Sequence, residues 1–449
     1  MRRIAWLLTL FTLSQTGPPP AKAQSTNPVF PYPIKTATLE NGLTIISVPF
    51  DSPGIIAYYT IVRAGSRNEV EPGLSGFAHF FEHMMFRGTA RYPQEAYNNV
   101  LKSLGADSNA FTTDDWTCYH MTIPSSALAK AVEIEADRFR NLKYDEPDFQ
   151  KEARAVLGEY NKGASSPFLM LNETMQDKAY SKHTYKHTTI GFLADVKNMP
   201  TQFEYSKTFF NRWYRPENCT IVVAGEVDHD KLVTLVRDHY GSWEPGKSSV
   251  VIPAEPPQKE PRSASLDWPL PTLPILYLGY HIPSGDPSDP DSAPLSALAQ
   301  SVFGETSPLY KAFVLDEQKV VALTADPEAK RDPGLFTILL RIRDPKDLPD
   351  IRKRVESALV GAVKEPISDR RLSSIKAHLR YAYANSLDTA DAVAHSVCES
   401  IATTGRPDAM KKRDDALQQL TPADLQRVAE RYFSPSNQTT VILQSEINP

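Results

Sequence analysis

The chain is organised around residues 76–86, which read Gly76-Phe77-Ala78-His79-Phe80-Phe81-Glu82-His83-Met84-Met85-Phe86. At 100° per residue the stretch is an amphipathic helix, with one apolar stripe formed by Phe77, Phe80, Phe81 and Met84. His79, Glu82 and His83 fall on the opposite side. Two imidazoles one turn apart can bind a zinc ion, and the glutamate between them stays free to act as a base. The stretch therefore predicts a metal-binding helix that packs on the core through its apolar stripe.

The composition is that of a folded globular chain. Of the 449 residues, 41% are hydrophobic and 23% are charged, which is enough material for two or three cores. Residues 1–23 begin Met1-Arg2-Arg3, continue with an apolar stretch and end Ala21-Lys22-Ala23, a pattern that predicts a secretory signal. We therefore expect an exported, periplasmic protein without a membrane partner after signal removal. A membrane anchor is the alternative, but the apolar stretch is short for a bilayer span.

Charge and cysteine content limit the partners and the crosslinks. Loss of the signal would remove Arg2, Arg3 and Lys22 and change the formal charge from 49 − 54 = −5 to 46 − 54 = −8. This balance argues against a nucleic-acid partner. The cysteines are odd in number, so at most one disulfide can form within the chain; they are Cys118, Cys219 and Cys398. We interpret them as small buried free thiols.

The residues around the metal helix indicate one antiparallel sheet with covering helices. An Asn41-Gly42 turn precedes a strand at 44–48, and a second strand follows at 55–62. Ser75 is the expected N-cap of the metal helix and Gly88 its stop. Further along, helices are predicted at 95–104 and 125–141 and a strand pair at 107–123.

Another helix begins near Glu146-Pro147 and carries Glu152 and Glu159 two turns apart on one face. A catalytic zinc site has three protein ligands and an open position, and the first helix supplies only two. Glu159 is the candidate third ligand, with Glu152 as a supporting carboxylate. Zinc would polarise the scissile carbonyl and its attacking water, while Glu82 would take the proton and pass it to the leaving amine. A solvated helix face is the alternative for both glutamates.

A second pair, His183 and His187, also has i, i+4 spacing. It lies in residues 181–189, which have neither a helical apolar stripe nor a carboxylate to spare. We therefore do not expect this pair to bind metal.

The segment around residue 216 returns near the C-terminus. Pro216 and Asn218 are matched by Pro435 and Asn437 at an offset of 435 − 216 = 219. An offset this long indicates that a whole domain is duplicated. The predicted organisation is a catalytic zinc domain at 24–245, a linker at 246–264 and a homologous domain at 265–449. Residues 293–299 occupy the place of the metal helix in the second copy and contain no histidine or glutamate, so this copy is predicted to be non-catalytic.

Residues 65–67, Gly-Ser-Arg, and residues 76–89 resemble the signature of the inverted-zincin peptidases, the pitrilysin, insulin-degrading and mitochondrial-processing-peptidase group. The resemblance covers nearly the whole mature chain. It implies an α+β fold of two homologous α/β sandwich domains, each a largely antiparallel sheet packed with helices. It also implies one zinc ion per chain, bound by His79, His83 and Glu159, with Glu82 as general base and Glu152 in support.

The resemblance extends to substrate and partner. Residues Asn109, Ala110 and Phe111 match the family's edge strand, which implies that an extended peptide adds alongside it. Larger members close four such domains around the substrate, and this chain supplies two, so pairing with another chain is implied. Val314 and Ala322 stand where members often carry a substrate-gripping Arg and Tyr. We therefore expect a homologous chain to supply that pair in a heterodimer, with a homodimer as the alternative.

These patterns predict a zinc-dependent endopeptidase that hydrolyses peptides or unfolded segments bound in extended form. The alternative from another class is a non-catalytic assembly or peptide-binding subunit, in which the motif would have decayed. A purely structural zinc site is a further alternative, but it would require a fourth protein ligand.

Overall fold

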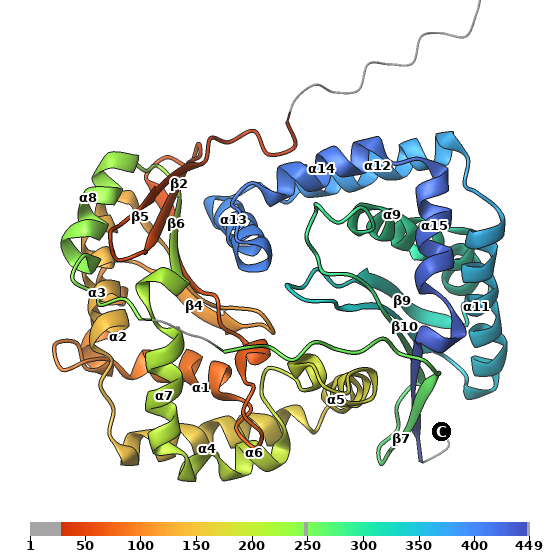
Figure 1. Cartoon of the computed structure of the whole chain (residues 1–449), viewed down its shortest axis with the longest axis horizontal. Coiled ribbons are helices and arrows are strands. Elements are labelled where there is room, and N and C mark those ends of the chain that lie inside the picture. The colour runs from red at the N-terminus through yellow and green to blue at the C-terminus, as the bar shows by residue number, and fades with distance from the viewer. Residues whose placement is uncertain (1–27, 247–249, 447–449) are drawn as a thin grey trace, which may run out of the picture.

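The computed structural model describes residues 28–246 and 250–446, which form two sheets packed with helices (Figure 1). The predicted signal at 1–23 lies outside the described residues. The strands of the first sheet are β1 (Lys35–Thr38), β2 (Thr44–Pro49), β3 (Ile55–Val62), β4 (Asp107–Thr112), β5 (Thr117–Pro124) and β6 (Cys219–Gly225). Those of the second sheet are β7 (Arg262–Trp268), β8 (Ile275–His281), β9 (Val320–Pro327), β10 (Leu335–Ile342) and β11 (Gln438–Ser445).

Helices follow the same division. The first half contains α1 (Phe77–Met84), α2 (Gln94–Ser103), α3 (Leu128–Asn141), α4 (Glu146–Gly163), α5 (Pro167–Ala179), α6 (Leu193–Asn198), α7 (Phe203–Trp213) and α8 (His229–Tyr240). The second half contains α9 (Ser292–Phe303), α10 (Pro308–Tyr310), α11 (Leu348–Lys364), α12 (Asp369–Asn385), α13 (Ala390–Thr404), α14 (Ala409–Gln419) and α15 (Pro422–Tyr432). No helix among the described residues is long and apolar enough to cross a membrane.

The strand orders are β1-β2-β6-β3-β5-β4 and β7-β11-β8-β10-β9. β2 runs parallel to β6 and β7 runs parallel to β11, whereas the other neighbouring strands are antiparallel. The predicted class, two largely antiparallel sheets packed with helices, is confirmed. The single antiparallel sheet expected around β2 and β3 needs one correction, because the fully buried β6 inserts between them and pairs with β2 in parallel.

The repeated residues make the same contacts in both halves. The side-chain amide of Asn218 donates to the carbonyl of Trp213 at 2.9 Å, and that of Asn437 donates to the carbonyl of Tyr432 at 2.8 Å. In each half this bond joins the end of a helix to the turn before the central strand β6 or β11. The sequence repeat therefore corresponds to a repeated structural unit.

The two halves exchange helices. α13, from the second half, packs on β3 and β6 of the first sheet, and α5, from the first half, packs on β7, β8 and β11 of the second sheet (Figure 1). Each exchange forms an apolar core of its own: Val393 and Val397 join Ile46 and Val222, and Leu171 joins the second sheet. The sequence offers no sign of this exchange, because each helix has an ordinary apolar face that fits either sheet.

Residues 250–261 contain no helix or strand and run from the first half to the second (Figure 1). β7 begins at Arg262, inside the predicted linker. Each cysteine is buried and free, which confirms their interpretation as free thiols.

Candidate metal centre

Helix α1 packs on the core through the stripe that its periodicity predicts. Phe77, Phe80, Phe81 and Met84 are each at most 1% exposed. The Phe81 ring stacks on that of Phe209 in α7, with 5.7 Å between centroids. Burial of apolar surface stabilises the packing of α1 by about 25 cal/mol per Å². The opposite, polar face of α1 is turned toward α4.

The start of α1 is held by a carboxylate from the loop that precedes it. Gly76 is the N-cap, with a φ of 94°, and a Cβ there would lie 2.6 Å from the carbonyl oxygen of Ile190. The two carboxylate oxygens of buried Glu69 accept hydrogen bonds from the backbone N–H groups of Gly76 and Ala78, at 2.6 and 2.7 Å. Burial raises the pKa of Glu69 to about 8, although both N–H groups act against the shift. A carboxyl in this position satisfies N–H groups that have no partner within the helix.

The expected N-cap at Ser75 is wrong. The Ser75 hydroxyl instead donates to Asp195 at 2.6 Å and accepts from the backbone N–H of Phe192 at 2.9 Å. Ser75 therefore links the loop before α1 to α6 by a hydrogen bond to Asp195. Gly88 ends the short 3-10 turn, Met85–Arg87, that continues α1, with a φ of 88°.

His79, His83 and Glu159 come together. Their ligand atoms all lie within 4.8 Å of one another. Oε2 of Glu159, on α4, is 3.7 Å from Nε2 of His79 and 3.3 Å from Nε2 of His83. Burial, followed by the neighbouring imidazole of His83, lowers the pKa of His79, which favours its neutral form.

His83 is oriented by Glu152. Nδ1 of His83 donates to Oε1 of Glu152 at 3.0 Å, while Oε2 of Glu152 accepts hydrogen bonds from the Arg87 guanidinium. The hydrogen bond from His83 to Glu152 is the largest contribution to the raised pKa of His83. Burial raises the pKa of Glu152, but the bonds from His83 and Arg87 outweigh it and the net shift is downward. Glu152 is thus an ionised partner that fixes the ring of His83.

Glu82 lies beside this group on a small cavity. Its Oε2 accepts a hydrogen bond from the Thr112 hydroxyl at 2.7 Å, at the end of β4. Burial raises the pKa of Glu82 above its usual value, partly offset by Thr112. The cavity has a volume of about 240 Å³ and is lined by Glu82, His83, Phe86, Arg87, Gln94 and Glu152. A carboxylate that faces a cavity and is not itself in the ligand group is suited to proton transfer.

The donor set fits a zinc ion. In neutral His83 the Nδ1 proton is bonded to Glu152, so Nε2 of the same ring presents a lone pair to Glu159. Nε2 of His83 and Oε2 of Glu159 are 3.3 Å apart, and their lone pairs repel each other unless a cation or a proton lies between them. Two imidazole nitrogens and one carboxylate oxygen are ligands that zinc takes at sites which keep an open position. His79, His83 and Glu159 would therefore hold the ion.

Asn109, Ala110 and Phe111 lie in β4, the edge strand of the first sheet nearest α1. β4 pairs with β5 on one side only, and in the described part of the chain no strand pairs with its outer edge. Ala110 is buried, whereas Asn109 is exposed.

The second histidine pair binds other partners. Nε2 of His183 donates to Asp332 at 2.9 Å, and Nε2 of His187 lies 3.8 Å from Glu69. These carboxylates come from distant parts of the chain, which the local sequence could not show. The two rings take part in no three-ligand group among the described residues.

Three residues of the site were not assigned from the sequence. Arg87 stands inside the stretch 76–89 that carried the resemblance, and Thr112 directly follows the edge-strand residues Asn109, Ala110 and Phe111, but neither side chain had an assigned role. Glu69 precedes the motif by ten positions and carries no local signal, because its role depends on how the loop folds back onto α1.

Comparison with known families gives two matches along the chain. The family model described as insulinase (peptidase family M16) matches residues 57–191, and the one described as the peptidase M16 inactive domain matches residues 202–379. The chain belongs to peptidase family M16, as its resemblance to the inverted-zincin peptidases implied.

Its relatives include the zinc protease PqqE of Helicobacter pylori, 27% identical over 420 residues that cover 91% of this chain and 92% of that protein. The probable β-subunit of the mitochondrial-processing peptidase of Schizosaccharomyces pombe is 25% identical over 414 residues, 88% of each chain. Both of these relatives are named as peptidases, and proteins of Mycobacterium leprae and Mycobacterium bovis that match about half of this chain are named as uncharacterized zinc proteases.

Solved structures share the fold. A protease from Helicobacter pylori superposes with a TM-score of 0.85 at 27% identity, covering 92% of this chain and all of that one. An M16-like peptidase from Alicyclobacillus acidocaldarius gives a TM-score of 0.82 at 19% identity and covers 93% and 99% of the two chains. The periplasmic protease PqqL from Escherichia coli gives a TM-score of 0.76 at 19% identity and covers 92% of this chain and 47% of that one. The last two support the fold alone.

Proposed function

We propose that this chain is a zinc-dependent endopeptidase that hydrolyses peptides or unfolded segments bound in extended form. The observation that carries the proposal is the convergence of His79, His83 and Glu159 within 4.8 Å, with Glu82 on the adjoining cavity. A decayed, non-catalytic relative would not be expected to keep all four groups in place. The match described as an inactive domain, residues 202–379, contains none of them.

Each protein group has a distinct task in this proposal. A zinc ion bound by the three ligands would supply Lewis acidity to the scissile carbonyl and to the attacking water. Glu82, held by Thr112, accepts a proton from that water and later donates it to the leaving amine. Glu152 keeps the Nδ1 proton of His83 engaged, so that Nε2 serves as a ligand.

The substrate would add as a strand to the outer edge of β4. The position of β4 at the sheet edge supports this proposal: backbone groups of Asn109, Ala110 and Phe111 would pair with an extended peptide, and such pairing needs no particular side chain. The Thr112–Glu82 hydrogen bond links the end of β4 directly to the proton-transfer group, so a peptide on this edge would pass the metal ligands.

A homologous partner chain would complete the site. Val314 lies in a π-helical turn, Lys311–Asp316, and Ala322 lies in β9, so these two positions offer neither a guanidinium nor a phenol to a substrate. We propose that another chain supplies such groups in a heterodimer. Full activity in a homodimer of the purified chain would contradict this part of the proposal. We also propose export to the periplasm, on the strength of the signal pattern at 1–23.

The test combines zinc content with cleavage of a quenched, unstructured peptide, for the chain alone and as co-purified from its native host. We expect one zinc per chain, loss of cleavage on chelation and recovery on adding zinc. Glu82→Gln should bind zinc normally and cleave at least about 100-fold more slowly. A variant that binds zinc and cleaves as fast as the wild type would show that the proposed mechanism is wrong.

A further inference from the structure

The hairpin of β9 and β10 extends from the second half and contacts the first. We call residues 328–332, in the connection between these two antiparallel strands, the hairpin tip. Its own half holds it in place: the backbone N–H of Gly285 donates to the carbonyl of Lys330 at 2.7 Å, and a Cβ on Gly285 would lie 2.6 Å from Cα of Ala329. The hairpin tip is therefore a packed element whose position is set by the second half.

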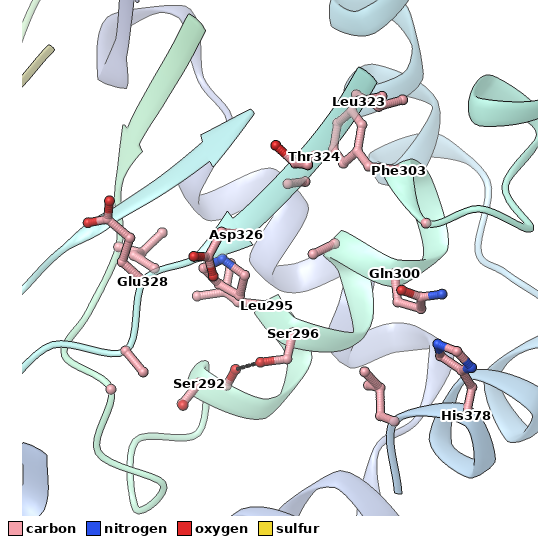
Figure 2. A pocket seen from close by; sticks show the side chains of 18 of the residues that line it. Ser292, Leu295, Ser296, Gln300, Phe303, Leu323, Thr324, Asp326, Glu328 and His378 are labelled. Carbon is pink, nitrogen blue, oxygen red and sulfur yellow. Dashed lines mark hydrogen bonds between the residues drawn. The ribbon is translucent and has the colours of Figure 1, made fainter. Parts of the chain in front are cut away.

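Lys330 joins the two halves through carboxylates on either side of it. Its Nζ lies 2.8 Å from Oδ2 of Asp114, in the turn that follows β4, and 2.9 Å from Oε2 of Glu328, in the hairpin tip itself. Glu328 also lines a cavity of about 960 Å³ beside β9, where Figure 2 shows it next to Asp326. The side chains of Lys330 and Asp114 are only 14% and 15% exposed. Burial alone would lower the pKa of Lys330, but Asp114 and Glu328 outweigh it and the net shift is upward, so the ammonium stays charged.

Two further contacts of the hairpin tip reach the same region of the first half. The backbone N–H of Arg331 donates to Oδ2 of Asp115 at 2.9 Å. Oδ2 of Asp332 accepts hydrogen bonds from Nε of Arg67 at 2.6 Å and from Nε2 of His183 at 2.9 Å. The hairpin tip therefore binds both the turn after β4 and the loop that contains Arg67.

The loop that contains Arg67 leads to the start of the metal-binding helix. Arg67 lies in a 3-10 turn, Ser66–Asn68, and the next residue, Glu69, is the carboxylate that accepts the first backbone N–H groups of α1. The backbone N–H of Arg67 also donates to the carbonyl of Asp114 at 2.8 Å, which ties this loop to the turn after β4. A shift of Arg67 would therefore move Glu69, and with it the start of the helix that bears His79 and His83.

The turn after β4 leads to the proposed proton-transfer group. Asp114 stands two residues after Thr112, whose hydroxyl donates to Glu82 at 2.7 Å. The turn is closed by the backbone N–H of Thr113, which donates to the carbonyl of Trp116 at 2.9 Å. Because the turn is closed in this way, a shift of Asp114 would move the end of β4 and the hydroxyl that holds Glu82.

We propose that Lys330 and Asp332 are positioning residues for the active site, because the hairpin tip fixes the two loops that present Glu69 to α1 and Thr112 to Glu82. The assignment rests on the proposed function, since it gives the second half, which carries none of the metal ligands, a task in the reaction. Both residues act through the loops that they hold and not on the substrate.

Hydrogen exchange of the zinc-loaded full chain tests this link without requiring cleavage. Lys330→Met leaves Asp114 and Glu328 without the cation between them, and their repulsion should push the hairpin tip away from the turn. We expect the amides of residues 66–84 and 107–116 to exchange at least about 10-fold faster than in the wild type, because both segments would open locally. Exchange in α8 and α11 should not change.

A second variant addresses the contact with the other loop. Asp332→Asn replaces a carboxylate that is 27% exposed and removes its ionic bond with Arg67. It should speed exchange at 66–84 and weaken zinc binding by about 3- to 10-fold, measured by competition with a chromophoric chelator, while exchange at 107–116 stays close to that of the wild type. Lys353→Met, at an exposed position on α11, is the matched control and should behave like the wild type in both measurements.

Kinetics with the native partner present test whether Lys330 acts through Thr112. At saturating zinc, Lys330→Met should lower kcat by about 10-fold, because Glu82 is no longer held in place. If both residues act on Glu82 along one path, the Lys330→Met/Thr112→Val double variant should lose no more than the weaker of the two single variants. Losses that multiply would overturn the path from the hairpin tip to Glu82.

The outcomes separate this proposal from the proposed function. Wild-type exchange at both segments in a folded Lys330→Met variant would overturn the positioning role, and so would wild-type exchange and zinc affinity in Asp332→Asn. If circular dichroism shows that Lys330→Met does not fold, Asp332→Asn alone decides. If exchange and zinc affinity change as expected but the wild-type chain, with its native partner, cleaves no peptide, the link between the hairpin tip and the site stands and the endopeptidase proposal fails.

Discussion

Nδ1 of His83 donates a hydrogen bond to Oε1 of Glu152 at 3.0 Å, and the other oxygen of this carboxylate is bonded by Arg87. Glu152 is therefore held from two sides, and it holds the imidazole of His83 in one tautomer and one orientation. Because the ring proton is on Nδ1, Nε2 of His83 carries a lone pair that points toward Glu159, as a metal ligand requires.

The first prediction concerns this contact. Glu152→Gln should keep the fold but weaken zinc binding by about 10- to 100-fold, because the amide accepts a weaker hydrogen bond from His83 and loses the ionic bond with Arg87. Competition with a chromophoric chelator measures the affinity directly. Glu95→Gln, at an exposed position on α2, should bind zinc like the wild type. Unchanged affinity in Glu152→Gln would mean that the contact does not orient the ligand.

A second prediction concerns Thr112 and Glu82. Thr112→Val preserves shape and removes the 2.7 Å hydrogen bond to Glu82. Because hydrogen bonds to charged groups are worth about 1.5–3 kcal/mol, we expect kcat to fall about 10- to 100-fold, with zinc content unchanged. Thr112→Ser keeps the hydroxyl and should recover most of the activity. If the valine variant is as active as the serine variant, Thr112 has no role in positioning Glu82.

Local sequence pattern accounts for the features that could be predicted, and long-range contacts account for those that could not. The helix at α1 and the facing of His79, Glu82 and His83 follow from a 3.6-residue period within one short stretch, and the α4 helix follows from its own first turn. The capping of α1 by Glu69 could not be predicted, because it depends on a loop that folds back. Ser75 looked like an N-cap for the same reason, since nothing local showed that Asp195 would take its hydroxyl.

The exchanged helices and the cavities are still harder to predict from the sequence. α13 packs on a sheet whose strands lie more than 160 residues earlier in the chain, and one cavity is lined by both Phe111 of the first half and Glu399 of the second. Periodicity identifies which face of a helix is apolar but not which sheet covers it. The repeat offset did identify one equivalent contact, because Asn218 and Asn437 make the same hydrogen bond to the end of the preceding helix.

A third prediction concerns stability and pH through Asp291, which is 0% exposed. Its carboxylate accepts hydrogen bonds from Arg427, Arg431 and Tyr432. Burial raises the pKa of Asp291, but these bonds outweigh it and the net shift is downward. Asp291→Asn should lower the free energy of unfolding at neutral pH by about 1–3 kcal/mol, since the arginines are partly solvated and lose only part of their partner.

The sign of the pH effect follows from the lowered pKa. A carboxyl whose folded pKa lies below its unfolded value of about 4 stabilises the fold above that pH and loses this contribution as the pH falls through the folded pKa. Thermal unfolding followed by circular dichroism should therefore show a smaller loss of Tm below pH 4 in Asp291→Asn than in the wild type. Asp415→Asn, at an exposed position on α14, should follow the wild type. Parallel curves for Asp291→Asn and the wild type would contradict the assignment.

The exchanged helices lead to a fourth prediction, about how the halves stay together. A protease site inserted within residues 250–261 would allow the connection to be cut, and we expect the two fragments to co-elute as one species in size-exclusion chromatography, because α5 and α13 each belong to the core of the other half. Leu171→Ala and Ile401→Ala should each lower the denaturant midpoint at which the fragments separate, since truncating a buried leucine or isoleucine costs about 2–5 kcal/mol. Val360→Ala, half-exposed on α11, should leave that midpoint unchanged. Fragments that separate in buffer without denaturant would show that the exchanged helices do not hold the halves together.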